Sequence, residues 1–241
     1  MLEKNMENFK ISATELAAKI DHTLLKPEAT LADIEHICRQ AIHYGFAAVC
    51  VNPCYTKHAA QLLQNHSPKV CSVVGFPLGA SHTRIKQAEA IQNIQDGAQE
   101  LDMVINISAA LTGNYEYVAQ DIKAVLLTCR QANPPIILKI ILEMRILLPE
   151  TKLRICRIAN DLGADFLKTS TGLHPAGGAT IDDVKFLHQH RGSCKVKAAG
   201  GIRNLPATQD LLRAGTDRIG TSSGPAIIHE LIQNPQAPQK S

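Results

Sequence analysis

The sequence has no tryptophan, and only 4% of its 241 residues are aromatic. Basic and acidic residues are nearly balanced, at 25 and 22, and no run rich in lysine and arginine occurs. Surfaces that bind nucleic acid combine basic patches with stacking aromatic rings, so we expect no nucleic-acid partner. The net charge of +3 suits a small phosphorylated or acidic substrate.

Long apolar segments are also missing. No stretch of about 18 consecutive apolar residues occurs, so we expect no membrane span and no membrane partner. The first residues, MLEKNMENFKIS, contain no apolar core of signal-peptide length, which favours a cytoplasmic location. Cysteines stay reduced in that compartment, and none of the seven belongs to a CxxC pair.

Motifs for metals and nucleotides are absent as well. His188 and His190 are the closest pair among ten histidines, but an HxH pair near an expected helix end is typical of a solvated helix tail. Neither GxGxxG nor GxxxxGK(S/T) occurs, which disfavours sites for dinucleotides and nucleoside triphosphates. We therefore assign no metal and expect neither a dinucleotide nor a nucleoside triphosphate as a ligand.

What the sequence does contain is a repeated pattern, in which a helical segment ends in glycine and a short apolar run follows within a few residues. Glycine at this point supplies the left-handed conformation that ends a helix. The closing glycines are Gly45, Gly97, Gly163 and Gly215. Capping residues predict helix starts at Thr30 with Asp33, at Ser81, and at Thr180 with Asp183.

Eight apolar runs alternate with these helical segments. They lie near 20–25, 46–52, 70–76, 100–106, 136–143, 165–171, 194–201 and 217–223. Near-continuous apolar runs between helices predict parallel strands, and eight of them favour a closed (β/α)8 TIM barrel of the α/β class. No linker divides the chain, so we expect residues 1–241 to form one domain with frayed ends, about 1–9 and 233–241.

Four consecutive runs carry an ionisable residue toward the carboxyl end, where barrel active sites lie. These residues are Asp102, Lys139, Lys168 and Lys197. Neighbouring strands lie about 4.8 Å apart, so two inward-facing lysines on adjacent strands should approach closely, and at least one pKa must fall. A neutral lysine attacks carbonyl carbons, which indicates Schiff-base chemistry. The alternative is a structural network that pairs Asp102 with Lys139 or Lys197 inside the barrel.

The last two runs end in small residues, within KAAGGIR and RIGTSSGPAII. Such residues let backbone N–H groups approach an anion, and the second run leads into a helix with Pro225 in its first turn. Loops after strands 7 and 8 commonly bind phosphate in barrels. We favour a phosphate site here over ordinary tight turns, which use the same residue types.

Seven blocks, in chain order, resemble those of the deoxyribose-phosphate aldolase family: IDHTLLKP, AVCVNP, VVGFPLG, ELDMVIN, FLKTSTG, KAAGGIR and RIGTSSG. The resemblance covers about residues 19–230 and is highly specific because the blocks keep their order. It implies a class I aldolase on a (β/α)8 barrel. Such an enzyme reversibly cleaves 2-deoxy-D-ribose 5-phosphate into D-glyceraldehyde 3-phosphate and acetaldehyde in deoxyribonucleoside catabolism, without a metal or organic cofactor.

The resemblance also implies roles for individual residues. Lys168 would form the Schiff base, Lys197 would lower the pKa of that amine, and Asp102 would relay protons through a bound water. Lys139 would order the network. The positions implied for the sugar are Asp21, Thr23, Cys50 and Thr171, and those implied for the phosphate are Gly172, Gly200, Gly201, Gly220, Ser222 and Ser223.

Three departures from the family pattern stand out. Met144 and Arg145 replace a threonine and a small residue after the fifth run, and the loop TGLHPAGGAT is one residue longer than usual, which brings His174 and Pro175 near the mouth. We expect His174 to be a surface residue. The tyrosine that ends some family members is missing, since the last tyrosine is Tyr117.

Two other functions remain compatible with parts of the pattern, and a third is disfavoured. One is a lysine-dependent aldolase for another phosphorylated aldehyde, and a second is a non-catalytic barrel that binds sugar phosphates. A phosphate-binding isomerase would use carboxylate bases instead of two facing lysines. The family resemblance implies a homo-oligomer, a dimer or a tetramer.

Overall fold

The computed structural model describes residues 10–233. The expected frayed ends lie outside this range, apart from Gln233, which is the last residue of the final helix.

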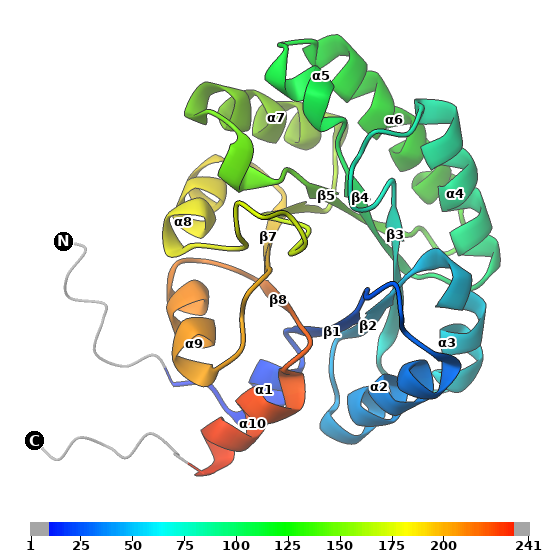
Figure 1. Ribbon diagram of the computed structural model, residues 1–241, viewed down its shortest axis with the longest axis vertical. Helices are drawn as coiled ribbons and strands as arrows, with labels where there is room; N and C mark the ends of the chain where they lie inside the picture. Colours follow the sequence, from blue (N-terminus) through cyan, green and yellow to red (C-terminus); the bar gives the residue numbers. More distant parts are fainter. Residues whose placement is uncertain (1–9, 234–241) are drawn as a thin grey trace, which may run out of the picture.

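Eight parallel strands close into a barrel in sequence order, as predicted (Figure 1). The strands are β1 (Ile20–Leu24), β2 (Ala48–Val51), β3 (Lys69–Val74), β4 (Glu100–Val104), β5 (Ile137–Ile141), β6 (Phe166–Lys168), β7 (Lys195–Ala199) and β8 (Arg218–Thr221). β8 pairs with β1 and closes the barrel. The fold is therefore a (β/α)8 TIM barrel.

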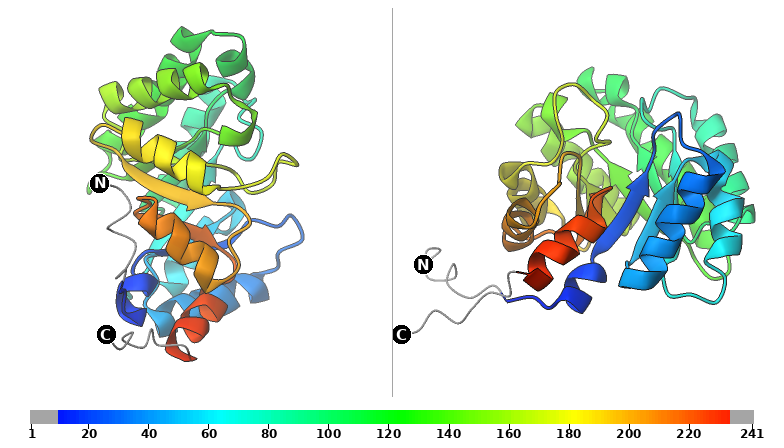
Figure 2. Two further views of the ribbon diagram at one scale, coloured as in Figure 1. Left: turned by 90° about the vertical axis from the view of Figure 1, so that its left-hand side faces the viewer. Right: turned by 60° about the horizontal axis from the view of Figure 1, so that its bottom comes forward.

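Helices surround the barrel (Figures 1 and 2). They are α1 (Ala13–Ala17), α2 (Leu31–Tyr44), α3 (Thr56–Leu62), α4 (Thr83–Gln95), α5 (Ile107–Leu111), α6 (Tyr115–Gln131), α7 (Pro149–Leu162), α8 (Ile181–His190), α9 (Leu205–Arg213) and α10 (Gly224–Gln233), with 3-10 turns η2 (Pro53–Tyr55) and η3 (Met144–Ile146). Helix α1 precedes β1 and packs against α10, so the two ends of the described chain meet there.

The predicted helix ends are mostly confirmed. Thr30 and Asp33 form a reciprocal capping box at the start of α2, and Thr180 accepts a hydrogen bond from the Asp183 N–H at the start of α8. The four predicted closing glycines all have positive φ. The prediction at Ser81 is wrong: α4 begins at Thr83, because the N–H groups of the first turn bond to the His82 carbonyl.

Two apolar clusters fill the part of the molecule that the structure describes. The larger cluster lies between the strands and the surrounding helices, where Val, Ile and Leu predominate. The smaller one consists of Ala48, Cys50, Cys71 and Val73 on β2 and β3. Bulky branched side chains usually fill a barrel interior. Here small residues leave room for buried charged side chains, which positions the site described below.

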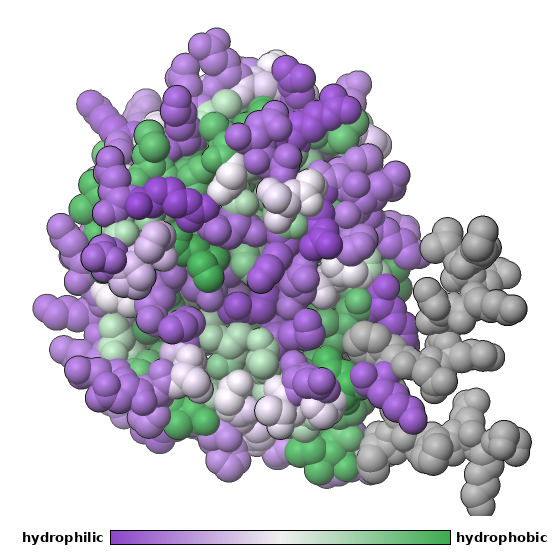
Figure 3. Space-filling view, turned by 180° about the vertical axis from the view of Figure 1, so that it is seen from behind, coloured by the Kyte–Doolittle hydropathy of each residue, from purple (hydrophilic) through white to green (hydrophobic). Residues whose placement is uncertain are grey.

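Hydrophilic side chains dominate the face seen in Figure 3, and hydrophobic side chains lie among them in separate groups. Between residues 10 and 233, no helix combines the length and the hydropathy that a membrane crossing requires.

Candidate active site

Strand register brings the four predicted charged residues together. Asp102 lies opposite Lys139 on the neighbouring strand, and Lys168 lies opposite Lys197. All four side chains point into the barrel, as alternation along the strands predicts. Lys168 is 2% exposed, and the other three are fully buried.

Asp102 is the common partner of the three lysines. Its Oδ2 accepts hydrogen bonds from the Nζ of Lys168 at 2.7 Å and of Lys197 at 2.6 Å. Its Oδ1 accepts one from the Nζ of Lys139 at 2.8 Å and one from the Cys71 thiol at 3.2 Å. Hydrogen bonds between charged groups are the strong ones, so these contacts hold the three amines around one carboxylate.

Three further charged residues extend this network toward the amino ends of the strands. Lys139 also contacts Glu100 at 2.6 Å, and Lys197 contacts Asp21 at 2.5 Å. Arg218 joins those two carboxylates, with its guanidinium bonded to Asp21 and to Glu100. The sequence alone indicates one carboxylate near the lysines, Asp102, and does not predict the part that Glu100 and Arg218 take in this network.

The network changes the expected electrostatics of the lysines. Burial lowers the pKa of Lys197, but the carboxylates of Asp102 and Asp21 outweigh burial and hold that pKa above its ordinary value. Lys139 has a raised pKa for the same reason, with burial opposed mainly by Asp102. The predicted fall in pKa therefore does not occur at Lys197, because more carboxylates surround it than the sequence indicated.

The carboxylate of Asp102 is shifted in the opposite direction. Burial raises its pKa, but the ammonium groups of Lys139, Lys168 and Lys197 lower it well below its ordinary value. Asp102 is therefore a stable anion at neutral pH, surrounded by amines that can exchange protons with it.

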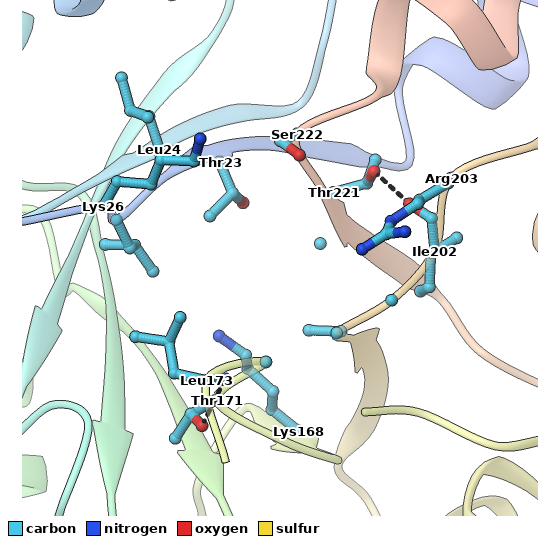
Figure 4. A pocket seen from close by; sticks show the side chains of 16 residues that line it. Thr23, Leu24, Lys26, Lys168, Thr171, Leu173, Ile202, Arg203, Thr221 and Ser222 are labelled. Atoms are coloured by element: carbon cyan, nitrogen blue, oxygen red, sulfur yellow. Dashed lines mark hydrogen bonds between the residues drawn. The ribbon is translucent and has the colours of Figure 1, made fainter. Parts of the chain in front are cut away.

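A cavity of about 290 Å³ lies at the carboxyl ends of β1, β6, β7 and β8. Its lining includes Thr23, Lys26, Lys168, Thr171, Gly172, Gly200, Gly201, Arg203, Gly220 and Ser222. In Figure 4 the Lys168 amine and the Arg203 guanidinium are directed into the space between these loops. A buried amine thus meets a solvent-accessible cavity at the mouth of the barrel.

Close backbone packing shapes the part of the cavity predicted to bind phosphate. A Cβ on Gly172 would lie 3.1 Å from the Gly200 Cα, and both residues have positive φ. A Cβ on Gly220 would lie 3.2 Å from the Lys197 Cε. Glycine at these positions lets the loops after β6 and β7 touch and leaves room for Lys197.

The structure separates the other predicted site residues into two groups. Thr23, Thr171 and Ser222 line the cavity. Asp21 and Cys50 are fully buried and do not belong to its lining, and Asp21 instead pairs with Lys197 and Arg218. Ser223 also lies outside the lining, and its N–H bonds to the Thr221 hydroxyl.

Two basic residues of the lining were not predicted, namely Lys26 and Arg203. Both stand in motifs that were recognised, HTLLKP and KAAGGIR, directly after the strand. Each is a basic residue in a loop that follows a strand at the mouth of the barrel. That position is the sequence signal by which they could be predicted as phosphate ligands.

The departures in the loops fall mostly outside the cavity. Met144 is buried in η3, and Arg145 is exposed. The preceding Glu143 accepts a hydrogen bond from the Thr171 hydroxyl at 2.5 Å, which ties the loop after β5 to the cavity. His174 is exposed, as expected, and its Nδ1 accepts a hydrogen bond from the Ala176 N–H.

Cys50, Cys71 and Asp102 have ligand atoms within 4.8 Å of one another, close enough for one metal ion. The oxygens of Asp102 are already bonded to three ammonium groups. Those charges repel an added cation, so this cluster does not fit a metal ion.

A lysine that opens onto a cavity at the carboxyl mouth of a (β/α)8 barrel, with a carboxylate bonded to its amine, defines the class I aldolases, enzymes that work through a lysine Schiff base. Sequence comparison is consistent with this class. Residues 15–228 match the DeoC/LacD family aldolases, and the chain belongs to that family.

Individual relatives cover nearly the whole chain. A deoxyribose-phosphate aldolase of Carboxydothermus hydrogenoformans is 46% identical over 92% of this chain and 97% of its own length. The deoxyribose-phosphate aldolase of Thermococcus gammatolerans is 47% identical over 89% of this chain and 95% of its own. The tetrameric enzyme of the same name from Aeropyrum pernix superposes with a TM-score of 0.85 at 33% identity, with 92% of each chain covered.

Proposed function

We propose that this protein reversibly cleaves 2-deoxy-D-ribose 5-phosphate into D-glyceraldehyde 3-phosphate and acetaldehyde, in the breakdown of deoxyribonucleosides. The observation that carries the proposal is the position of Lys168. Its amine opens onto the cavity while it bonds to Asp102 at 2.7 Å. The names of the relatives supply the substrate.

In the proposed reaction, Lys168 is the nucleophile. It transfers a proton to its carboxylate partner, and the neutral amine adds to the C1 aldehyde of the open-chain sugar. Asp102 then returns that proton to the departing hydroxyl, and loss of water gives an iminium ion. Lys197 and Lys139 hold the Asp102 carboxylate in place through contacts of 2.6 and 2.8 Å. These four residues form the proposed catalytic group, with no metal or organic cofactor.

The iminium ion accepts the electron pair of the C2–C3 bond when that bond breaks. The C3 hydroxyl loses its proton toward Asp102, and because Asp102 does not line the cavity, a water molecule must carry the proton between them. D-glyceraldehyde 3-phosphate leaves, and the remaining enamine is protonated at C2. Addition of water to the resulting iminium releases acetaldehyde and regenerates the Lys168 amine.

We assign the phosphate to the loops after β6, β7 and β8, with Gly172, Gly200, Gly201, Gly220 and Ser222 closest to it. Lys26 and Arg203 supply positive charge at the same cavity. Ser223 acts through the turn at the start of α10. Thr23 and Thr171 line the space left for the sugar, and the buried Asp21 and Cys50 support it from below.

The direct test is a cleavage assay with purified protein and 2-deoxyribose 5-phosphate, followed by proton NMR in the presence of EDTA. We expect equimolar acetaldehyde and D-glyceraldehyde 3-phosphate. Binding without products would favour a non-catalytic barrel. Faster cleavage of another phosphorylated sugar would identify an aldolase of different specificity.

Replacing Arg203 by glutamine tests the phosphate assignment. Loss of one charge-assisted hydrogen bond is worth about 1.5–3 kcal/mol, so the KM for deoxyribose 5-phosphate should rise roughly tenfold to hundredfold. Turnover of unphosphorylated deoxyribose, which lacks the group, should stay the same. Arg145→Gln is the matched control, because Arg145 is exposed at the same end of the barrel but lies outside the cavity lining. Equal losses on both sugars would contradict the assignment.

We also propose that the protein is cytoplasmic, that each chain folds as one domain, and that the chains associate into a homo-oligomer. The tetrameric relative from Aeropyrum pernix supports self-association, and light scattering of the purified protein would measure the number of subunits.

A further inference from the structure

Each of the eight strands contributes at least one titratable side chain to the barrel interior. In strand order they are Asp21, Cys50, Cys71, Glu100 with Asp102, Lys139, Lys168, Lys197 and Arg218. The proposed reaction uses the residues nearest the cavity. Glu100 and Arg218 are the first residues of β4 and β8, at the end of the barrel away from the cavity, and the reaction as described leaves them without a role.

Six of these residues form a closed ring in which charges alternate in sign. Starting at Asp102, the ring runs through Lys139 (2.8 Å), Glu100 (2.6 Å), Arg218 (3.1 Å), Asp21 (2.7 Å) and Lys197 (2.5 Å), and returns to Asp102 (2.6 Å). We call this set the charge ring. It contains three cations and three anions, so it is neutral as a unit.

Lys168 is attached to the charge ring but is not part of it. Among residues 10–233 its single carboxylate contact is with Asp102, through an oxygen that it shares with Lys197. When Lys168 is protonated, the buried assembly carries one uncompensated positive charge. When Lys168 is neutral, the assembly is balanced. A buried site disfavours uncompensated charge, so the charge balance of the ring bears directly on this amine.

We propose that Glu100 and Arg218 are positioning residues that set the protonation state of Lys168 by keeping the charge ring neutral. The inference deepens the proposed function, on which it rests. Neither residue touches the cavity, so each acts through its partners, Glu100 through Lys139 and Arg218 through Asp21 and Lys197. The thiols of Cys50 and Cys71, counted as neutral, complete the interior without changing this balance.

The two single substitutions should move the deprotonation of Lys168 in opposite directions along the pH scale. Simple destabilisation of the protein would not produce opposite shifts. Glu100→Gln leaves the ring with an extra positive charge, so Lys168 should lose its proton at lower pH. Arg218→Gln leaves an extra negative charge, so Lys168 should lose its proton at higher pH. At about 10 Å, two strands away, a unit charge corresponds to a shift of about one pH unit.

The readout is the pH dependence of adduct formation between Lys168 and acetaldehyde, trapped with cyanoborohydride and quantified by peptide mass spectrometry. This measurement needs no sugar phosphate, so it separates the present inference from the proposed function. We expect the acidic limb of the profile to move to lower pH in Glu100→Gln and to higher pH in Arg218→Gln. In the double variant it should return to the wild-type pH.

Arg218→Lys, which keeps the charge, should retain the wild-type profile. Lys195→Gln is the matched control, since Lys195 is an exposed cation that begins β7 at the same end of the barrel. Shifts of the same sign in both single variants, no shift in either folded variant, or a double variant no better than its parents would overturn the inference. If a single variant fails to fold, the pH profiles of the double variant and of Arg218→Lys still test the inference. A wild type that traps acetaldehyde but leaves deoxyribose 5-phosphate intact would refute the proposed function alone.

Discussion

Replacement of Lys168 by alanine should reduce cleavage of deoxyribose 5-phosphate by at least about 1,000-fold, on the scale seen when nucleophiles are removed from other enzymes. The reason is structural, because Lys168 combines a buried amine, a carboxylate partner and a place in the cavity lining. In wild type, borohydride should reduce the Schiff base between acetaldehyde and Lys168 to a stable adduct on the Lys168 peptide. In the variant that adduct should disappear.

Lys195→Ala is the control for this prediction. Lys195 is exposed and precedes Lys197 by two residues, and its loss should alter neither trapping nor turnover. An adduct found on the Lys197 peptide in wild type, with activity retained in Lys168→Ala, would transfer the role of nucleophile to Lys197.

Replacement of Asp102 by asparagine should slow turnover by about 100- to 10,000-fold, the usual range for loss of a general acid–base group. The shape of the side chain is kept, but the anion that accepts protons from Lys168 is lost. Trapping of acetaldehyde on Lys168 should persist, which distinguishes this variant from Lys168→Ala. Full turnover in Asp102→Asn would contradict the proton-relay role.

The same substitution should lower the free energy of unfolding by about 3–5 kcal/mol, because it leaves buried ammonium groups without a partner. The lysines hold the pKa of Asp102 well below its unfolded value, which is about 3.9. Its stabilisation is therefore complete above about pH 4 and is lost as pH falls through the folded value. Denaturant unfolding as a function of pH should show a weaker acid dependence in the variant.

Asp121→Asn is the matched control for stability without chemistry. Asp121 on α6 and Lys86 on α4 form another fully buried ion pair, 2.5 Å long, outside the barrel interior. Its loss should destabilise the protein to a similar degree and leave turnover intact. A comparable loss of activity in Asp121→Asn would mean that the effect of Asp102→Asn reflects stability alone.

Much of the fold could be predicted because the signals are local. Strand runs of Val, Ile and Leu, and helices closed by residues such as Gly45, depend on backbone preferences that few neighbours can override. The prediction at Ser81 was wrong because His82 occupies the N-cap position of α4, so the serine lies one residue before the cap. Inward-facing charges were predictable for the same reason as the strands, since alternation places every second side chain inside.

The sequence alone was sufficient for the barrel, for Lys168, Lys197, Asp102 and Lys139 inside it, and for small residues at the cavity loops, because each depends on spacing along a single strand or turn. Glu100 and Arg218 are far apart in the chain, and closure of the barrel brings them into direct contact, with Asp21 on β1 bonded to the same guanidinium. Likewise, the presence of Lys26 and Arg203 in the cavity lining depends on the conformation of their loops. The charge balance around Lys168 thus arises from contacts among six strands, and a linear pattern carries no information about which of its charges will share a buried volume.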